Sequence, residues 1–392
     1  EFRITEILSL CPPWYAVAAV ALLHRKVTAG TANHGEHGGF RFKTLETNIA
    51  TKLYKPKLIM KLADIHWGII GAGDVCEVKS APAMNKIAGS KLVAVMRRNG
   101  EKARDFARRH GVPKWYDDAD QLINDPEVNA IYIATPPDSH EHYTLKAAKA
   151  GKPVYVEKPM ARTYQECLSM IDACQKANVP LFTAYYRRML PNFLKIKSLL
   201  NEGVIGEVRY VTILLNKTQQ PNIVGASKSA DNWRIIPDIA GGGYFFDLAC
   251  HQLDILDFLF GPIQGANGYA VNQAGLYPAE DIVVGSFYFG NRIMGQGTWC
   301  FTTSGTSDKE VTTIVGSKGQ ISFPYFGDHS VTLEVDGKEK EVMTFNIAVH
   351  IQQPLIQTIV DELLGKGHCP STGVSGARTN KVMELICGRM PG

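Results

Sequence analysis

Several features that mark particular classes of protein are missing from this sequence of 392 residues. The eight cysteines include no Cys-x-x-Cys pair and no spacing typical of metal ligands, which argues against a disulfide framework or a zinc site. No basic run is interleaved with aromatic residues, and a net charge of +4 over this length predicts no nucleic-acid partner. The apolar stretch at residues 15–23 is too short to span a bilayer. We therefore expect a cytoplasmic protein with buried thiols, no metal and no membrane partner.

The composition is that of an ordinary globular protein, with 45% hydrophobic and 20% charged residues. A chain of this length exceeds a comfortable single core, so we expect two domains. Residues 1–59 differ from the rest, because they lack a sustained hydrophobic period and begin with Glu1-Phe2, which an EcoRI site encodes in frame. We expect residues 1–59 to be a non-native or poorly structured extension, the alternative being a degenerate signal peptide.

From Ile65 onward, short apolar runs alternate with amphipathic stretches, which is the pattern of parallel βαβ units. One helix is expected at residues 139–150, where Asp138 or Ser139 can cap its start. We therefore assign residues 60–183 to a parallel α/β domain. Its expected strands are residues 66–71, 91–96, 130–134, 153–156 and 180–184.

The hydrophobic pattern of the sequence changes at about residue 184. Longer segments of alternating apolar and polar residues predict an antiparallel or mixed sheet, and a pair of helices is expected at residues 350–364 and 375–387. Residues 184–392 are therefore interpreted as an α+β domain, whose loops, including residues 219–231, shape a substrate pocket. Its expected strands are residues 207–215, 282–289, 296–301, 311–315 and 331–335.

A glycine-rich turn, Gly-Ala-Gly-Asp-Val-Cys at residues 71–76, follows the first expected strand. The first glycine permits a tight turn, and the second allows backbone N–H groups to approach a pyrophosphate, whose charge the helix dipole favours. Cys76 replaces the third glycine of this motif and is expected to pack against the sheet. A tight turn without a ligand is the alternative. The candidate cofactor-binding residues here are Gly71, Gly73, Asp74 and Val75.

The end of the second expected strand bears on the choice between NAD and NADP. A carboxylate there would bind the ribose hydroxyls of NAD, but the strand is followed by Arg97 and Arg98 and by no acid. Guanidinium groups suit the 2′-phosphate of NADP. We therefore expect both arginines to bind the cofactor and NADP to be preferred, unless both side chains face solvent.

The turn after the third expected strand contains Thr135, Pro136 and Pro137, with His140 close behind. The two prolines fix the backbone, and the turn lies at the edge of the sheet where ligands bind in such folds. We expect these residues to form a rigid platform for the nicotinamide ribose, although the segment taken alone is only a turn.

Two widely separated motifs carry the most specific signal. One is Glu-Lys-Pro at residues 157–159, and the other is Gly-Gly-Gly-x-x-x-Asp-x-x-x-His at residues 241–251. With these motifs in order behind the glycine turn, the sequence from about Met60 onward resembles the Gfo/Idh/MocA family, which includes glucose–fructose oxidoreductase and inositol dehydrogenase. The resemblance implies an NAD(P)-binding Rossmann domain and a C-terminal α+β domain on a large open mixed or antiparallel sheet. It also implies a homodimer or homotetramer formed through that sheet.

The resemblance makes Lys158 the catalytic lysine, Asp247 its acidic companion, and His251 the proton donor or acceptor for the substrate oxygen. Residues four apart on a helix share a face, so Asp247 and His251 can point into one cleft. The triple glycine would let the backbone pass close to a bound ring. A lysine close to the cationic nicotinamide can have a lowered pKa, and a histidine titrates near neutral pH. Without the Glu-Lys-Pro motif, Asp247 and His251 would be interpreted as a surface pair.

Other residues are expected to border the cleft between the domains. At the position of Tyr186, most relatives carry Asn or Gln, which points to an altered substrate pocket. Packing between the domains is the alternative for each of these residues. By the resemblance, the cofactor contacts are Glu157, Lys158 and Arg188, and the substrate contacts are Lys158, Tyr186, Trp233, Arg234, Asp247 and His251.

Three functions fit these observations. The first is an NAD(P)-dependent dehydrogenase or reductase that exchanges a hydride with the CH–OH group of a sugar, cyclitol or related polyol. The second is a redox-neutral, glycosidase-type elimination with retained NAD. The third is a ligand-sensing regulator on the same fold, against which the retention of Lys158, Asp247 and His251 argues.

Overall fold

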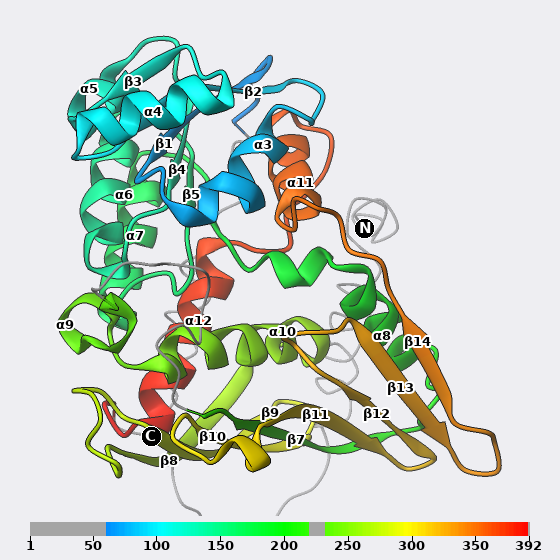
Figure 1. Ribbon diagram of the computed structural model, residues 1–392. Helices are drawn as coiled ribbons and strands as arrows, with labels where there is room; N and C mark the ends of the chain where they lie inside the picture. The colour runs from blue at the N-terminus through cyan, green and yellow to red at the C-terminus, as the bar shows by residue number, and fades with distance from the viewer. Residues whose placement is uncertain (1–59, 219–231, 391–392) are drawn as a thin grey trace, which may run out of the picture. The chain divides into compact units, whose positions relative to one another are not determined.

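The computed structural model describes residues 60–218 and 232–390, which all belong to one compact unit. The expected extension at residues 1–59 and the loop at residues 219–231 lie outside the described residues. Within the described ranges, no helix is long and apolar enough to cross a membrane. Two sheets, one of six strands and one of eight, organise the described chain (Figure 1).

The first sheet is parallel throughout, in the order β3-β2-β1-β4-β5-β6. This is a doubly wound Rossmann order, and it reverses between β1 and β4, where such folds bind dinucleotides. The five expected strands are confirmed within two residues at each end. The strand β3 was not foreseen, because three half-exposed or exposed residues show no period. The bounds are β1 Ile65–Ile70, β2 Ser90–Met96, β3 Lys114–Tyr116, β4 Ala130–Ile133, β5 Val154–Val156 and β6 Leu181–Thr183.

Three helices of this domain, α4, α5 and α7, begin with a side-chain cap. Asn99 accepts a hydrogen bond from a first-turn N–H of α4, and Thr163 does the same for α7. The expected cap of α6 is wrong, because the Ser139 hydroxyl donates to Thr135 Oγ1 (2.8 Å) and the helix has no side-chain cap. The bounds are α3 Ala81–Met84, α4 Gly100–His110, α5 Ala119–Asn124, α6 His140–Lys149 and α7 Tyr164–Lys176, with the π-helix η3 Cys76–Ser80 before α3.

The second sheet has the order β14-β13-β12-β11-β7-β10-β9-β8 and is mixed, because β7 and β10 are parallel while all its other pairs are antiparallel. The strands β8, β12 and β14 were not foreseen, and in β8 two glycines resemble turn residues. A side chain at Gly268 would collide with the backbone of Val284, so close packing requires this glycine. The bounds are β7 Val208–Asn216, β8 Ile263–Val271, β9 Ile282–Phe289, β10 Met294–Cys300, β11 Lys309–Gly316, β12 Gly319–Phe323, β13 Ser330–Val335 and β14 Glu341–Thr344.

Helices α10 and α12 lie over one face of this sheet (Figure 1). The two C-terminal helices also return to the first domain, α11 beside α3 and α12 against α7 and β6. The loop before α11 therefore reaches the cofactor side of the Rossmann sheet, where Gln352 N donates to Lys79 O (3.2 Å). The bounds are α8 Pro191–Asn201, α9 Pro237–Ala240, α10 Cys250–Phe260, α11 Gln353–Leu363 and α12 Gly373–Ile386, with the short turns η4 Pro137–Ser139, η5 Tyr186–Met189, η6 Trp233–Ile235 and η7 Phe245–Ala249.

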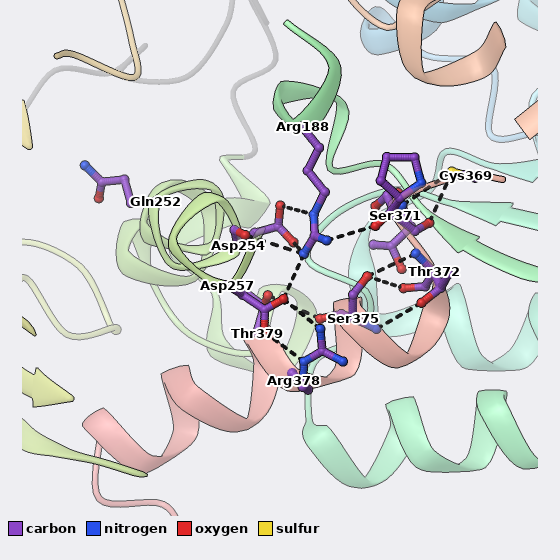
Figure 2. A network of polar contacts seen from close by, with 12 residues as sticks. Arg188, Gln252, Asp254, Asp257, Cys369, Ser371, Thr372, Ser375, Arg378 and Thr379 are labelled. Carbon is purple, nitrogen blue, oxygen red and sulfur yellow. Dashed lines mark hydrogen bonds and ion pairs between the residues drawn. The ribbon is translucent and has the colours of Figure 1, made fainter. Parts of the chain in front are cut away.

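A buried charge network ties η5 to α10 and α12 (Figure 2). The Arg188 guanidinium donates to both oxygens of Asp254 (2.9 and 2.6 Å), to Asp257 (3.3 Å) and to Pro370 O (2.8 Å). Arg378 forms two further hydrogen bonds with Asp257. All three nitrogens of its guanidinium donate within this network, so Arg188 fixes η5 to α10 inside the second domain, and the expected cofactor contact of Arg188 stays a prediction.

We predict that Arg188→Met lowers the free energy of unfolding by about 3–5 kcal/mol, because it leaves buried carboxylates without their cation. Chemical denaturation of the full chain measures the change. Arg108→Met is the matched control, since the Arg108 side chain is 76% exposed and its pair with Asp105 contributes at most about 1 kcal/mol. A loss in Arg188→Met no larger than that of the control would show that the network does not stabilise the fold.

Candidate active site

The glycine turn after β1 leaves room for a ligand. Gly71 has a φ of +84°, and a side chain there would lie 2.6 Å from Thr135 Cγ2, so the turn packs closely against the end of β4. At Gly73, by contrast, a Cβ would have only the Gly71 carbonyl oxygen within 4 Å, at 3.7 Å. The open space at Gly73 fits the approach of a dinucleotide pyrophosphate.

Cys76 packs against the sheet as expected. Its side chain is fully buried in the main apolar core, and burial raises the pKa of its thiol to about 12. A thiol with so high a pKa is neither a nucleophile nor a ligand at neutral pH.

The two arginines after β2 differ in exposure, with Arg97 half-buried and Arg98 exposed. Neither forms an ion pair with any other residue in the described ranges. Asp74, in the glycine turn, is also exposed, whereas Val75 lines the cavity described below.

The turn after β4 is rigid, but one of its residues does not have the expected role. His140 is fully buried, with Nε2 2.8 Å from Thr135 O and Nδ1 3.1 Å from Met160 O, and burial lowers its pKa. Its ring therefore fixes the turn after β4 to the turn after β5 and does not face a cofactor. Pro137 is buried in η4, while Pro136 is half-buried.

Glu157 organises the end of β5. Its Oε1 accepts hydrogen bonds from Tyr132 Oη (2.6 Å) and from Gln352 Nε2 (2.7 Å), while Oε2 accepts one from Lys158 N (3.1 Å). Gln352 comes from the loop before α11, about 200 residues away, and carries no motif that a sequence search would detect. The carboxylate thus fixes the backbone from which the Lys158 side chain projects.

Lys158 and Asp247 form a buried ion pair, with Nζ 2.6 Å from Oδ1 and 3.1 Å from the Asp247 carbonyl oxygen. Arg234 adds a second cation, its Nε lying 3.4 Å from Asp247 Oδ2. Burial by itself raises the pKa of Asp247, but these two cations more than offset it, so the pKa is lowered. Burial lowers the pKa of Lys158, but the Asp247 carboxylate outweighs burial and raises the pKa above its ordinary value. The protein's own groups therefore favour the charged form of Lys158, and the lowered pKa expected beside a cationic nicotinamide stays a prediction.

The triple glycine serves packing within the protein. A side chain at Gly241, whose φ is +83°, would lie 2.5 Å from the Arg162 carbonyl oxygen. One at Gly242 would collide with the ring of Phe246, and one at Gly243 would approach Ala279 to 2.8 Å. Gly241 thus allows the chain before η7 to pack on the first domain, whereas Gly242 and Gly243 allow close packing within the second domain. The expected passage beside a bound ring stays a prediction.

His251 lies one helical turn after Asp247, where the π-helix η7 continues into α10. It is 3% exposed, and aromatic rings surround it, including Tyr186 with ring centroids 5.5 Å apart and Phe326 at 6.0 Å. Burial, and then the charges of Lys158 and Arg187, hold its pKa well below the ordinary value. The imidazole is therefore neutral at pH 7 and can accept a proton.

A cavity of about 290 Å³ joins these groups. It includes the expected Lys158, Tyr186 and His251, but Asp247 stands behind Lys158, and neither Trp233 nor Arg234 reaches the wall. Arg234 instead packs over the Trp233 ring, 4.6 Å from its centroid. The cavity is lined by Val75, Lys79, Glu157, Lys158, Tyr186, Arg187, Leu215, Lys217, Leu248, His251, Phe326 and Gln352.

Comparisons with known proteins identify the family of this chain. Residues 65–185 match the family described as "Oxidoreductase family, NAD-binding Rossmann fold", and residues 193–322 match its C-terminal domain. Oxidoreductase P35 of Formosa agariphila is 40% identical over 324 residues, which are 83% of this chain and 98% of the relative. Myo-inositol 2-dehydrogenase of Thermotoga maritima is 29% identical over 194 residues, 50% of this chain and 54% of the relative.

Solved structures show the same fold. Aldose-aldose oxidoreductase from Caulobacter crescentus, complexed with glycerol, superposes with a TM-score of 0.71 at 24% identity, covering 82% of this chain and 96% of that one. Levoglucosan dehydrogenase in complex with NADH and levoglucosan gives a TM-score of 0.72 at 23% identity, with the same coverage. The two sheets and the family matches lead to one conclusion: the chain belongs to the Gfo/Idh/MocA family of oxidoreductases with an NAD-binding Rossmann fold.

Proposed function

We propose that this protein transfers a hydride between a nicotinamide dinucleotide, preferably NADP, and the CH–OH carbon of a sugar, cyclitol or related polyol. The observation that carries the proposal is the convergence of a charged lysine and a neutral histidine on one cavity beside the carboxyl edge of the Rossmann sheet. The names of the relatives, which include myo-inositol 2-dehydrogenase and levoglucosan dehydrogenase, support a polyol or sugar as substrate.

His251 and Lys158 have different roles in the oxidation because they differ in charge. His251, neutral and buried, accepts the proton of the substrate hydroxyl, and the Lys158 ammonium stabilises the negative charge that develops on the same oxygen. Asp247 keeps Lys158 charged and in place. Bound nicotinamide supplies the acceptor for the hydride, and we assign its dinucleotide to the turn Gly71–Val75, where the open space at Gly73 fits it.

Turnover is tested with a panel of sugars, inositols and diols, each with NAD and with NADP. The absorbance of the reduced nicotinamide measures the reaction. Net cofactor reduction by a member of the panel is the expected result. Bond cleavage in a glycoside without net change in the cofactor would contradict hydride transfer as the overall reaction and would favour the redox-neutral elimination.

The lowered pKa of His251 makes a prediction about pH. In the direction of alcohol oxidation, kcat/KM should stay high as the pH falls through 6.5, the ordinary histidine value, because His251 remains neutral there. His251→Asn should lower kcat/KM about 10²- to 10⁴-fold and remove the acidic limb that lies below that pH. His142→Asn, at an exposed histidine on α6, is the matched control and should keep the wild-type profile. A limb that persists in His251→Asn would assign that titration to another group.

The preference for NADP rests on Arg97 and Arg98 at the end of β2, where the sequence has no carboxylate. Neither arginine has an ion-pair partner among the described residues. An unpaired guanidinium at this place suits a 2′-phosphate. NAD is the competing cofactor, since structures of levoglucosan dehydrogenase hold NADH.

Arg97→Asp combined with Arg98→Ala should lower kcat/KM for NADP about tenfold to a hundredfold, because a charge-assisted contact is lost and a repulsive carboxylate is added. The same change should raise kcat/KM for NAD. Both cofactors are compared with one substrate at fixed ionic strength, with Arg108→Ala as the control on α4. An unchanged ratio of the two values would show that both arginines face solvent.

We further propose that the protein is a homodimer or homotetramer formed through the open face of the second sheet. The face opposite α10 and α12 exposes a contiguous set of apolar side chains on paired strands, and large exposed apolar patches mark association surfaces. Sedimentation of the full chain measures the mass, and a monomer at micromolar concentration would contradict the proposal. The exposed set includes Tyr210, Tyr269, Val284, Tyr288 and Met294.

A further inference from the structure

Arg187 is a buried cation without a counter-ion. It is 6% exposed, lies on η5 and lines the active-site cavity. Its guanidinium carbon lies 4.7 Å from the ring centroid of Phe326 and 5.3 Å from that of Tyr186. Nη1 donates to Tyr325 O, but Nε has no hydrogen-bond partner. In the described part of the chain, no carboxylate lies within ion-pairing distance of Arg187.

The neighbouring arginine shows what the fold provides for a purely structural cation. Arg188 is buried to a similar degree and has the two carboxylates of Asp254 and Asp257. Lys158, the other buried cation of the cavity, has Asp247. A buried charge without a partner is costly, so the exception at Arg187 indicates that its partner comes from outside the protein.

The charge of the cavity wall points the same way. Lys79 and Lys217 line the cavity with Arg187 and Lys158, whereas Glu157 is the one carboxylate in this lining. Both Glu157 oxygens already accept hydrogen bonds from protein groups. The cavity therefore carries an excess of positive charge that attracts an anion.

The charges of Arg187 and Lys217 act on the acid behind the wall, Glu310, but only from beyond ion-pairing distance. The carboxylate of Glu310 accepts hydrogen bonds from the backbone N–H groups of Tyr325 (2.8 Å) and Phe326 (3.0 Å), and burial raises its pKa. It forms no ion pair with Arg187 or with Lys217 in the described residues. His329, another titratable group near Arg187, has a pKa lowered by burial and is neutral at pH 7.

The positions of Arg187 and Lys217 separate them from the cofactor end. Arg187 follows β6 in η5, and Lys217 follows β7 of the second sheet, whereas the glycine turn and Lys79 belong to the start of the first domain. Phe326, which packs against Arg187, also lies against His251. The unpaired guanidinium is thus on the histidine side of the cavity, where the reacting carbon of the substrate must lie.

We propose that the substrate is an acidic sugar whose carboxylate binds to Arg187, with Lys217 as a second cation. A planar guanidinium presents parallel N–H donors that match a carboxylate, and the Phe326 and Tyr186 rings hold its plane. A cavity of about 290 Å³ suits a small molecule of this class. This inference rests on the proposed hydride transfer and specifies its substrate.

The test uses the full chain with both cofactors and compares D-glucuronate, D-galacturonate and D-gluconate with D-glucose and D-galactose. Turnover is measured by nicotinamide absorbance, and binding to the cofactor-saturated protein is measured by calorimetry. We expect a preference for an acid over its neutral counterpart. Arg187→Met should lower kcat/KM for the acid about tenfold to a hundredfold more than it lowers kcat/KM for the neutral sugar, mainly through KM.

Further variants make the result specific. Arg187→Lys should retain part of the preference, and Lys217→Met, at a half-exposed residue, carries the test if Arg187→Met does not fold. Arg209→Met is the matched control, because Arg209 on β7 has a side chain that is 58% exposed. Glucose 6-phosphate and glucose 6-sulfate form separate arms, and a preference for either over the acids would overturn the assignment to a carboxylate.

The outcomes separate this inference from the hydride-transfer proposal. Turnover of a neutral sugar with no preference for the acids would preserve hydride transfer and overturn the acidic substrate. Binding of an acid that is lost in Arg187→Met, without any change in the cofactor, would support the anion site and contradict hydride transfer for that acid. Failure of every acid to bind would overturn the inference.

Discussion

The ion pair between Lys158 and Asp247 joins the end of β5 in the Rossmann sheet to the π-helix that precedes α10. Both side chains are largely buried, so the pair is favourable only if its geometry is fixed and its remaining donors and acceptors are satisfied. Glu157 and Gln352 fix the lysine from one side, and Arg234 approaches the aspartate from the other. The position of the ammonium group in the cavity therefore depends on contacts between the two domains.

The same pair sets the chemistry of His251. With Lys158 held in the charged state, burial and two nearby cations keep the imidazole neutral. A charged lysine beside a neutral histidine suits the oxidation of a hydroxyl, because one group accepts the proton while the other stabilises the oxygen that loses it. The two residues thus take different protonation states at one pH, for reasons that lie in their surroundings.

Two adjacent arginines illustrate how one sequence segment can serve both stability and recognition. Arg188 points to α10 and α12 and is neutralised by two aspartates (Figure 2). Arg187 points to the cavity and has no such partner in the described chain. The network around Arg188 positions η5, and η5 in turn positions Tyr186 and Arg187 against His251.

Much of the fold could be predicted from the sequence, because buried parallel strands appear as short apolar runs between amphipathic helices. The strand β8 was missed, since Gly265 and Gly268 resemble turn residues, and they are explained only by the close approach of Tyr288 and of α12. The predicted side-chain cap of α6 is absent, because the Ser139 hydroxyl forms a hydrogen bond with Thr135 instead.

The site was only partly predictable, because some of its residues belong to sequence motifs and others do not. Lys158, Asp247 and His251 belong to compact motifs, whereas Gln352 and Phe326 reach the cavity from distant loops that have no local signature. The role of Arg188 had a signal that could have been used, because Asp254 and Asp257 stand one turn apart on a very apolar helix, where carboxylates need a cation. Such pairing depends on tertiary contacts, and periodicity alone does not specify the partner.

The central claim, that Lys158 acts on the reacting oxygen, is tested most directly by single-turnover kinetics of Lys158→Met with the best substrate of the panel. The account predicts that the rate of hydride transfer falls about 10²- to 10³-fold, while the NADP dissociation constant changes by a few-fold at most. Lys146→Met, at an exposed lysine on α6, should leave both quantities unchanged. A hydride-transfer rate in Lys158→Met within a few-fold of the wild-type value would contradict the account.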